Sequence, residues 1–409
     1  MSGRAMDGRH DLPEAAFAAA LACLPAVGAK WLGVALERFG PRELWDKVAA
    51  GDLAATRAAY RVSPVHAGKV RDWPSWASSF DVARFWQNCQ EAGISVTWPN
   101  APGFPPRLQE VPSPVGVLFV AGNPAALDNR QCVALVGTRH PSDDGLQTAF
   151  QLGYELARAG VCVVSGLAQG IDGAAHSGAV SAIREMGTVP GQCPLTIGVA
   201  ASGVDSPYPA QNAALWHEVA RQGAVVSEAP PGTRAQSWRF PVRNRVIAAL
   251  SQLVVVVECH LKSGTWHTVS AADDIGVDVG AVPGSVHQPS AAGSNKLLRA
   301  GAHVIRNTED ILDSLGGGRL FVPSERGNEA EHGEASAAVP GPAFPPPRNP
   351  LPLGPLEREV LSVFNGRSLA LDEVVERAQL PVGAVVLTLQ RLAESGQLLE
   401  SAGWWSKGV

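Results

Sequence analysis

The chain of 409 residues lacks several features that would place it directly in a class of protein. Its six cysteines stand at least 30 residues apart, so it has neither a CxxC metal site nor a compact disulfide framework. Scattered thiols of this kind are typical of a reducing cytoplasm. No apolar run approaches the ~18 residues that a membrane-spanning helix requires. We therefore expect a cytoplasmic protein without a membrane partner.

Net positive charge and the common cofactor motifs are also missing. The chain has 33 Lys and Arg against 38 Asp and Glu, a net charge of −5, so any nucleic-acid site must be local. Gly137 ends the first predicted strand of the central domain but does not begin a GxGxxG dinucleotide fingerprint, and GxxxxGK[ST] occurs nowhere. We expect no NAD, no P-loop nucleotide, no other cofactor and no metal.

Length and an apolar content of 45% indicate two or three domains. Residues 1–85 show helical patterning broken by Gly and Pro, which predicts a small helical domain of the SAM or helix-hairpin-helix kind. Residues 90–315 form the α/β domain described next. Residues 316–352 are rich in Pro and Gly and read as a flexible linker. Residues 353–409 show three apolar helical stripes and a hairpin, typical of a winged helix.

The central domain alternates short apolar runs with amphipathic helical patterns. The predicted strands are 132–136, 161–164, 195–200, 224–227, 253–257 and 279–282. Near-continuous apolar strands separated by helices indicate a mostly parallel sheet that is covered on both faces. The expected fold class is therefore α/β, doubly wound. In such sheets ligands gather where the carboxyl ends of strands meet helix N-termini.

Four of the predicted strands end in small, polar or glycine residues. These turns are Gly137–Arg139, Ser165–Ala168, Ser227–Gly232 and Lys262–Thr265. Glycine lets the backbone approach an anion, and the helix that follows offers free N–H groups and the positive end of its dipole. Together the four turns predict a phosphate-binding rim at one edge of the sheet.

The segment Arg234–Arg245 combines cations with aromatic rings. Its members are Arg234, Trp238, Arg239, Phe240, Arg243 and Arg245, and no acidic residue occurs from Ala229 to Val257. Guanidinium groups beside aromatic rings suit a single nucleic-acid strand, because they contact phosphates and stack on bases. Alternatively, the arginines pair with acids elsewhere and Phe240 belongs to the core. Pro241 is predicted to begin a helix that runs to Leu250.

Some residues also fit an enzyme. Asp172 and His176 lie four apart on one predicted helix face, as an acid/base or metal pair would. Glu228 and Glu258 follow strands, where catalytic carboxylates often lie. We favour a structural interpretation: Asp172 caps a helix, His176 is satisfied beneath the rim, and the two glutamates hold loops through backbone N–H groups.

At this point a set of ordered motifs resembles the central domain of the DNA-processing protein A family (DprA, also called Smf). The motifs are Phe104–Leu108, Gly137–Arg139, Ser165–Asp172 with Ala174–His176, Gly203–Asp205 with Tyr208-Pro209 and Asn212, Ser227-Glu228 with Pro230–Gly232, Phe240–Arg245, Ser263–Thr265, Val282–Gly284 and Gly293–Leu297. The helical segment before them and the winged helix after them are also similar to the family's layout.

The resemblance implies an extended Rossmann-like domain that binds single-stranded DNA and is not an enzyme. It further implies a homodimer that helps to load the RecA recombinase onto the strand in natural transformation or recombination. The residues that the resemblance places at the DNA, with Phe240 stacking on a base, are Gly137, Arg139, Ser165, Gly166, Phe240, Arg243, Asn244, Arg245, Lys262, Ser263, Gly264 and Lys296. Gln169 departs from the family pattern, since many relatives place Lys or Arg there.

A rival class comprises the cytokinin-activating phosphoribohydrolases called LOG, which share a related fold and cleave a nucleoside monophosphate. Their signature is PGGxGTxxE. Here the turn Ser263–Thr268 lacks the double glycine and has Thr268 where the carboxylate is needed, which counts against hydrolysis. In the C-terminal segment the third helix presents only Arg391, so we predict a protein-contact module rather than a duplex reader.

Overall fold

The computed structural model describes part of the chain, in two units that are treated separately, residues 1–321 and 322–409. The described residues are 11–52, 71–128, 131–187, 196–316, 354–364, 369–378, 380, 384–385, 388–389, 391–392, 397–401 and 404–407. Among these residues, no helix has both the length and the apolar character needed to cross a bilayer.

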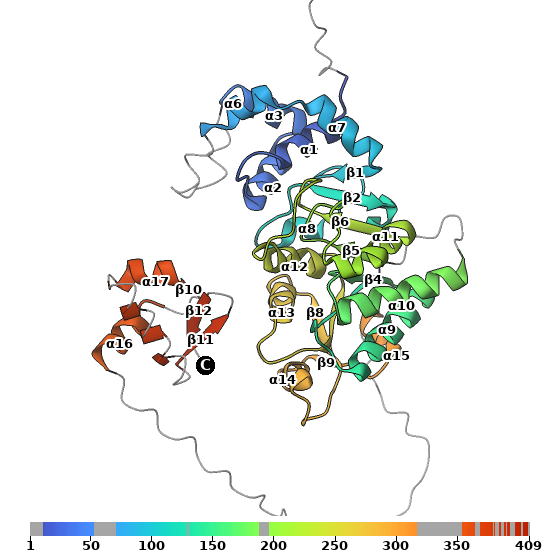
Figure 1. Ribbon diagram of the computed structural model, residues 1–409, viewed down its shortest axis with the longest axis vertical. Helices are drawn as coiled ribbons and strands as arrows, with labels where there is room; N and C mark the ends of the chain where they lie inside the picture. Colours follow the sequence, from blue (N-terminus) through green and yellow to red (C-terminus); the bar gives the residue numbers. More distant parts are fainter. Residues whose placement is uncertain are drawn as a thin grey trace, which may run out of the picture. The chain divides into compact units, whose positions relative to one another are not determined.

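A nine-stranded sheet forms the centre of the first unit (Figure 1). Its strands are β1 (Ile94–Thr97), β2 (Leu118–Gly122), β3 (Cys132–Gly137), β4 (Cys162–Ser165), β5 (Thr196–Val199), β6 (Ala224–Ser227), β7 (Leu253–Glu258), β8 (Asp278–Ala281) and β9 (His303–Val304). The order is β1-β2-β6-β5-β4-β3-β7-β8-β9, and all neighbours from β6 to β9 are parallel. The pairs β1–β2 and β2–β6 are antiparallel. The predicted α/β class with a mostly parallel sheet is confirmed.

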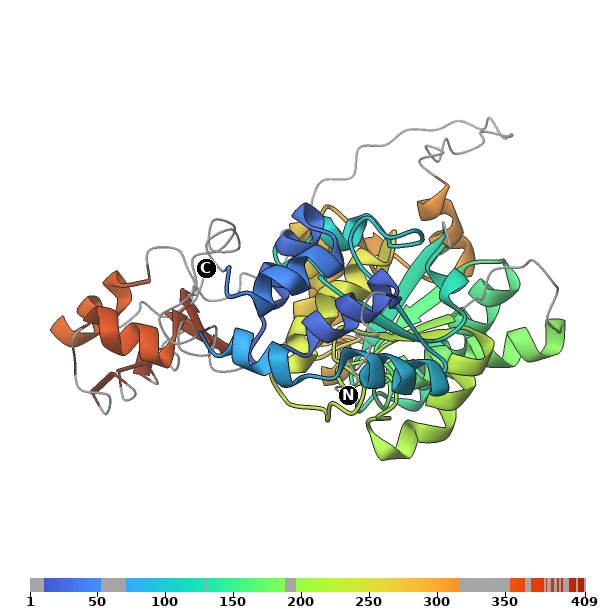
Figure 2. The ribbon, with the colours of Figure 1, turned by 90° about the horizontal axis from the view of Figure 1, so that it is seen from above.

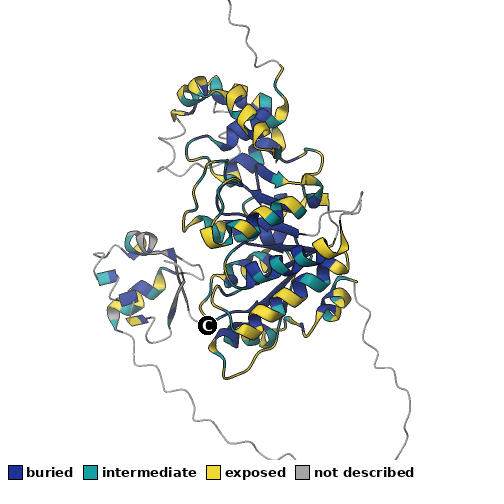
Figure 3. Cartoon of the chain, turned by 45° about the vertical axis from the view of Figure 1, so that its right-hand side comes forward, coloured by how far each residue is buried: buried dark blue, intermediate teal, exposed yellow. Residues whose placement is uncertain are grey.

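Helices cover both faces of this sheet, which is why its strands are dark blue in Figure 3. One face carries α9 (Asp143–Arg158), α10 (Ile171–Met186) and α15 (Thr308–Leu315), and the other carries α8 (Arg107–Glu110), α12 (Arg239–Ala249), α13 (Thr265–Asp274) and α14 (Ala292–Arg299). Helix α11 (Ala213–Gln222) packs on β2, β5 and β6. In β3, Val133 and Leu135 face α9 while Ala134 and Val136 face the opposite layer. Successive residues of the strand are thus apolar, because both faces of the sheet are buried.

In the described part of residues 11–91, five helices lie over the β1–β2 edge of the sheet (Figures 1 and 2). They are α1 (Glu14–Ala22), α2 (Ala29–Arg38), α3 (Pro41–Ala49), α6 (Trp73–Ser79) and α7 (Val82–Glu91). Their core is continuous with Phe119 of β2, Val225 of β6 and Trp216 of α11. The predicted boundary at residue 85 falls inside α7, and these helices share a core with the sheet edge.

The second unit contains α16 (Pro355–Ser362), β10 (Leu369–Ala370), α17 (Leu371–Ala378), β11 (Leu398–Ser401) and β12 (Trp404–Lys407). Its strands form an antiparallel sheet in the order β10-β12-β11. Val360, Phe364, Val374 and Trp405 contribute to its core. The predicted linker, 316–352, lies outside the described residues except for Gly316.

Helices α9 and α10 approach each other closely because glycines lie at their contact. A Cβ atom on Gly153 would lie 2.1 Å from the carbonyl oxygen of Ala175, and one on Gly178 would lie 2.0 Å from that of Phe150. These separations are too short for any side chain. The two helices follow β3 and β4 directly, so their spacing positions the loops at the carboxyl ends of both strands.

We expect Gly178→Ala to lower the free energy of unfolding by about 1–3 kcal/mol, because the added methyl group forces α10 away from α9. Helix propensity alone predicts the opposite sign, a gain of about 1 kcal/mol. Urea denaturation measures the difference, with Gln147→Ala on the exposed face of α9 as the control. Equal or higher stability of Gly178→Ala would show that the helices can separate without cost.

Candidate nucleic-acid interface

The carboxyl ends of the parallel strands meet at one edge of the sheet, which we call the rim. It consists of the loops 138–142, 166–170, 200–212, 228–238 and 259–264. Connections run outward in opposite directions from β3 and β7, so the topology reverses between these two strands. In open α/β sheets ligands bind at such a reversal, outside the carboxyl ends of the strands.

Arg139 and Phe240 form the first cation–aromatic pair of the rim. Arg139 follows β3 and is exposed, and its guanidinium carbon lies 5.3 Å from the centroid of the Phe240 ring. No carboxylate among the described residues forms an ion pair with Arg139. Phe240 is half-buried in the first turn of α12, so it is not a core residue. A cation and a ring thus face solvent together.

A second pair lies at the start of α12 and was not among the predicted site residues. Trp238 is 57% exposed, and the guanidinium carbon of Arg239 lies 4.6 Å from its ring centroid. Burial lowers the pKa of Arg239, and its Nε finds no hydrogen-bond partner in the described structure. The helix begins at Arg239, two residues before the predicted start at Pro241. The interleaving of Arg and aromatic residues was the available sequence signal for this pair.

Arg243, which the resemblance places at the DNA, is a buried residue. Its side chain is buried, and Nη1 donates hydrogen bonds to the carbonyl oxygens of Gly166 (2.7 Å) and Val199. Nε donates to Oδ1 of Asn244 at 3.2 Å. Burial lowers the pKa of Arg243 to about 10, an effect that the nearby Asp172 opposes. Arg243 remains charged at neutral pH and joins the ends of β4 and β5.

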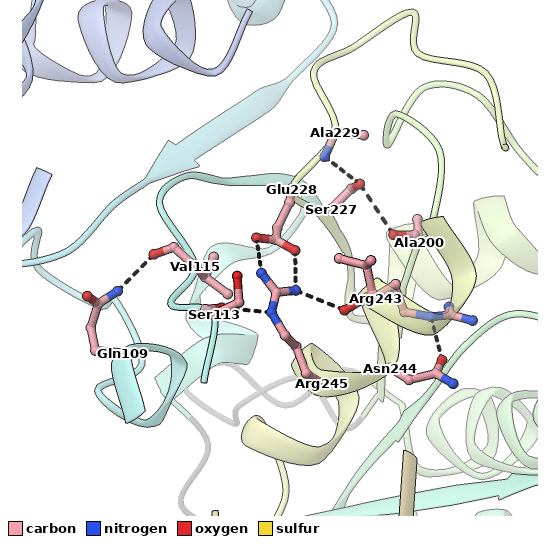
Figure 4. A network of polar contacts seen from close by, with 11 residues as sticks. Gln109, Ser113, Val115, Ala200, Ser227, Glu228, Ala229, Arg243, Asn244 and Arg245 are labelled. Atoms are coloured by element: carbon pink, nitrogen blue, oxygen red, sulfur yellow. Dashed lines mark hydrogen bonds and ion pairs between the residues drawn. The ribbon is translucent and has the colours of Figure 1, made fainter. Parts of the chain in front are cut away.

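Arg245 is occupied by an ion pair, and this corrects its predicted role as a phosphate ligand. Nη1 and Nη2 donate to the two carboxylate oxygens of Glu228 at 2.6 and 2.7 Å (Figure 4). Nε donates to the carbonyl oxygen of Ser113 at 2.7 Å, and Nη1 also to that of Val242 at 2.9 Å. With its hydrogen bonds taken and its side chain buried, Arg245 is structural.

Three further predicted contacts, Gly137, Ser165 and Gly166, are also engaged within the protein. Gly137 ends β3 in the ladder with β7. The hydroxyl of Ser165 donates to the carbonyl oxygen of Leu135 at 2.6 Å. The amide of Gly166 donates to Oδ2 of Asp172 at 3.1 Å. These residues shape the rim but do not offer free groups to a ligand.

The remaining predicted residues, at the start of α13, are more open. The hydroxyl of Ser263 accepts a hydrogen bond from the amide of Thr265, the first residue of α13, at 3.2 Å. Gly264 is exposed, and its carbonyl oxygen lies 3.4 Å from Nδ2 of Asn244. Lys262 precedes these residues and is exposed. A cation thus stands beside the positive end of a helix dipole.

Lys296 lies on α14 and belongs to the same side of the rim through Trp266. Its Nζ is exposed and lies 5.2 Å from the centroid of the Trp266 ring on α13. The pair resembles the two Arg–aromatic pairs described above in chemistry. It extends the cationic rim beyond the end of β7.

The acidic residues and His176 are engaged inside the protein, but only in part as predicted: Nε2 of His176 has no hydrogen-bond partner in the described structure, and the N-cap of α10 is Gly170. Nδ1 of His176 contacts Oγ1 of Thr196 at 2.8 Å, and burial lowers the pKa of His176 to about 4. Burial raises the pKa of Asp172, whereas Arg243 opposes the rise. Glu258 accepts hydrogen bonds from the amide and hydroxyl of Ser142, both at 3.0 Å. Among the described residues, no group of three or more His, Cys, Asp or Glu is arranged to hold a metal ion.

Comparison of the chain with known proteins identifies a family. The model of the DNA recombination-mediator protein A family matches residues 95–316, which include the whole nine-stranded sheet except the first residue of β1. The chain is 38% identical over 226 residues to DNA processing protein DprA of Bacillus subtilis, an alignment that covers 55% of this chain and 73% of the relative. The chain belongs to this family. The resemblance recognised in the sequence is confirmed.

Two other family members extend the similarity beyond the sheet. Protein Smf of Synechocystis is 32% identical over 340 residues, which cover 78% of this chain and 81% of the relative. The X-ray structure of DprA from Streptococcus pneumoniae superimposes with a TM-score of 0.59 at 27% identity. That superposition covers 74% of this chain and 97% of the pneumococcal one. Both alignments are longer than the matched range 95–316, so the similarity extends beyond the central sheet.

We expect Glu228→Ala to lower the free energy of unfolding by about 3 kcal/mol, because it leaves the buried Arg245 without its counter-charge. Glu228→Gln should lower the free energy of unfolding by less, since the amide oxygen still accepts one hydrogen bond from Arg245. Urea denaturation at pH 7 measures both variants, and Arg139→Ala serves as the exposed control with little change. If Glu228→Ala were as stable as the wild type, the ion pair would not hold the rim.

The pKa of His176 predicts a pH dependence of stability. The folded pKa of about 4 lies below the ordinary value of 6.5, so the unfolded chain binds a proton that the folded protein does not. Stability from this group is complete above pH 6.5 and falls as the pH drops toward 4, by roughly 3 kcal/mol in all. Urea titrations between pH 7 and 4.5 should show a shallower slope for His176→Gln than for the wild type. Parallel slopes would mean that His176 takes up a proton in the folded state.

Proposed function

We propose that this family member binds single-stranded DNA along the rim and does not cleave it. The observation that carries the proposal is the Arg139 guanidinium over the half-buried Phe240 ring, with no ion pair to Arg139 among the described residues. The supporting groups are Lys262, Gly264 and Ser263 at the start of α13 and Lys296 beyond them. Gly137, Ser165, Gly166, Arg243 and Arg245 would support these groups from behind.

The chemistry of the rim fits an unpaired strand better than a duplex. Guanidinium and ammonium groups attract phosphates of any sequence, and aromatic rings stack on any base. In a duplex the faces of the bases are covered by their neighbours, so Phe240 would have no surface to contact. The net charge of −5 restricts the attraction to this cationic rim.

A phosphoribohydrolase of the LOG class remains the rival function, and the α13 turn argues against it. Thr268 stands at the position where that class needs a carboxylate, and it is 2% exposed on the first turns of α13. Incubation with AMP should therefore release no free adenine, as chromatography would detect. Base release that disappears in a Ser263→Ala variant would favour the rival.

We further infer that this domain is of the extended Rossmann-like kind and that the C-terminal unit is a winged helix. The β10-β12-β11 sheet beside α16 and α17 supports the latter. With five basic and seven acidic residues from 353 to 409, this unit suits contact with a protein. We propose a homodimer that passes its bound strand to the RecA recombinase, inside the cell and without a cofactor.

Arg139→Ala and Phe240→Ala should each weaken binding of a fluorescent poly-dT oligonucleotide by about ten- to a hundredfold. Arg139→Ala should also make the salt dependence of log K shallower by about 0.7, the effect of one lost phosphate contact. Fluorescence anisotropy between 50 and 300 mM salt measures both quantities.

The matched control is Arg158→Ala, which removes an exposed guanidinium from the end of α9 that lies away from the rim. It should change the affinity less than twofold. Unchanged affinity in Arg139→Ala and Phe240→Ala, with binding of the wild type intact, would place the DNA elsewhere on the protein. A wild type that prefers duplex of equal length would overturn the proposed function itself.

A further inference from the structure

Tyr208 is an exposed aromatic residue that continues the surface of Phe240. It lies on the loop between β5 and α11, and half of its side chain is accessible to solvent. Its ring centroid is 5.5 Å from that of Phe240, with the ring planes tilted by 53°. Phe240 thus lies next to both Arg139, from the loop after β3, and Tyr208, from the loop after β5.

The loop that carries Tyr208 is held firmly by hydrogen bonds on both sides of the residue. Before it, Oγ of Ser202 donates to the carbonyl oxygen of Ser206 at 2.6 Å, and the carboxylate of Asp205 accepts from the amide of Gly232 at 2.8 Å. After it, Nδ2 of Asn212 donates to the carbonyl oxygens of Leu167 and Ala168 at 3.0 and 2.9 Å. Tyr208 is thus presented by a fixed backbone.

The base of this loop is buried although its tip is exposed. Val204 is buried in the core under α11, and its carbonyl oxygen accepts a hydrogen bond from Nε1 of Trp216 at 3.1 Å. The amide of Gly203 donates to the carbonyl oxygen of Thr233 at 2.8 Å. These contacts fold the loop without help from the Tyr208 ring, whose hydroxyl has no hydrogen-bond partner in the described structure.

The Tyr208 ring is exposed and does not contribute to the core. Because hydrogen bonds hold its loop, the ring is suited to contact a ligand. Neighbouring rings whose centroids are 5.5 Å apart touch each other, so no base fits between Phe240 and Tyr208. Their tilt turns the outer faces in different directions. The exposed surface of the Tyr208 ring can therefore accept a base of its own.

We propose that Tyr208 is a second base-stacking platform, which takes the nucleotide next to the one on Phe240. This inference rests on the proposed function, since it assigns a further subsite to the same single strand. Stacking on Tyr208 is tolerant of base identity, because every base has a π-face. With a phosphate at Arg139 and bases on Phe240 and Tyr208, the strand runs across the rim toward the loop after β5.

Abasic scanning of an oligonucleotide tests the proposal directly. A dT oligomer the length of the minimal site is made in versions that each lack one base, and the dissociation constant of each version is measured for the wild type, Tyr208→Ala and Phe240→Ala. In the wild type, two adjacent abasic positions should each weaken binding by about 5- to 100-fold. In Tyr208→Ala, one of the two positions should lose its effect, and in Phe240→Ala the other.

Two control variants separate stacking from other effects. Tyr208→Phe keeps the ring and should reproduce the wild-type profile. Phe150→Ala removes a comparably exposed aromatic residue, 41% accessible, from the outer face of α9 and should also leave the profile unchanged.

The outcomes distinguish this inference from the function on which it rests. If the wild type binds the strand and Tyr208→Ala retains both sensitive positions, the second platform is wrong while the proposed function stands. If Tyr208→Ala weakens binding equally at every position, Tyr208 acts on the loop and not on one base, and the inference is again overturned. If the wild type does not bind single-stranded DNA, both fail.

Discussion

The rim depends on one buried cation, the guanidinium of Arg243. It joins the carbonyl oxygen of Gly166, after β4, to that of Val199, at the end of β5, and it does so from α12. Because Phe240 lies three residues earlier on the same helix face, fixing Arg243 also fixes the ring that faces solvent. Gly166 is required at this junction, since a Cβ atom there would lie 2.6 Å from both Arg243 Nη2 and Asp172 Oδ2. The ends of β4 and β5 are thereby joined to α12 by one side chain.

The charges around Arg243 are arranged so that the rim stays positive. Asp172 favours the charged form of Arg243, whereas the nearby Arg139 disfavours it and so lowers its pKa. Burial raises the pKa of Asp172, which means that its negative charge is itself costly at this depth. Two guanidinium groups therefore share one carboxylate. A phosphate beside Arg139 would supply a second negative charge. The excess positive charge of the two guanidinium groups therefore favours the binding of an anion at the rim.

The sheet was predictable, but the direction of the arginine side chains was not. Runs such as 253–257 are apolar at every position, because both faces are covered, and this pattern is visible in the sequence. The edge strands β1 and β9 escaped detection because they are less completely buried than the central strands, whereas β2 is buried on both faces and was missed although Leu118–Val120 are apolar. Arg243 and Arg245 lie near the N-terminus of a helix, where a cation is unfavourable without an anion. That anion is Glu228 for Arg245, a partner 17 residues away that only the fold brings near.

The same cluster of arginines thus divides into residues that build the surface and residues that face the ligand. The structural arginines use the planar guanidinium group to donate several hydrogen bonds. Arg245 donates to both carboxylate oxygens of Glu228, and Arg243 donates to the carbonyl oxygens of Gly166 and Val199. A lysine could replace their charge but not this geometry. Arg139 instead needs only charge and reach, because its partner is a ring and, on our proposal, a phosphate. The sequence motifs contain structural and ligand-facing arginines and do not distinguish them. The burial of the side chain in the fold does.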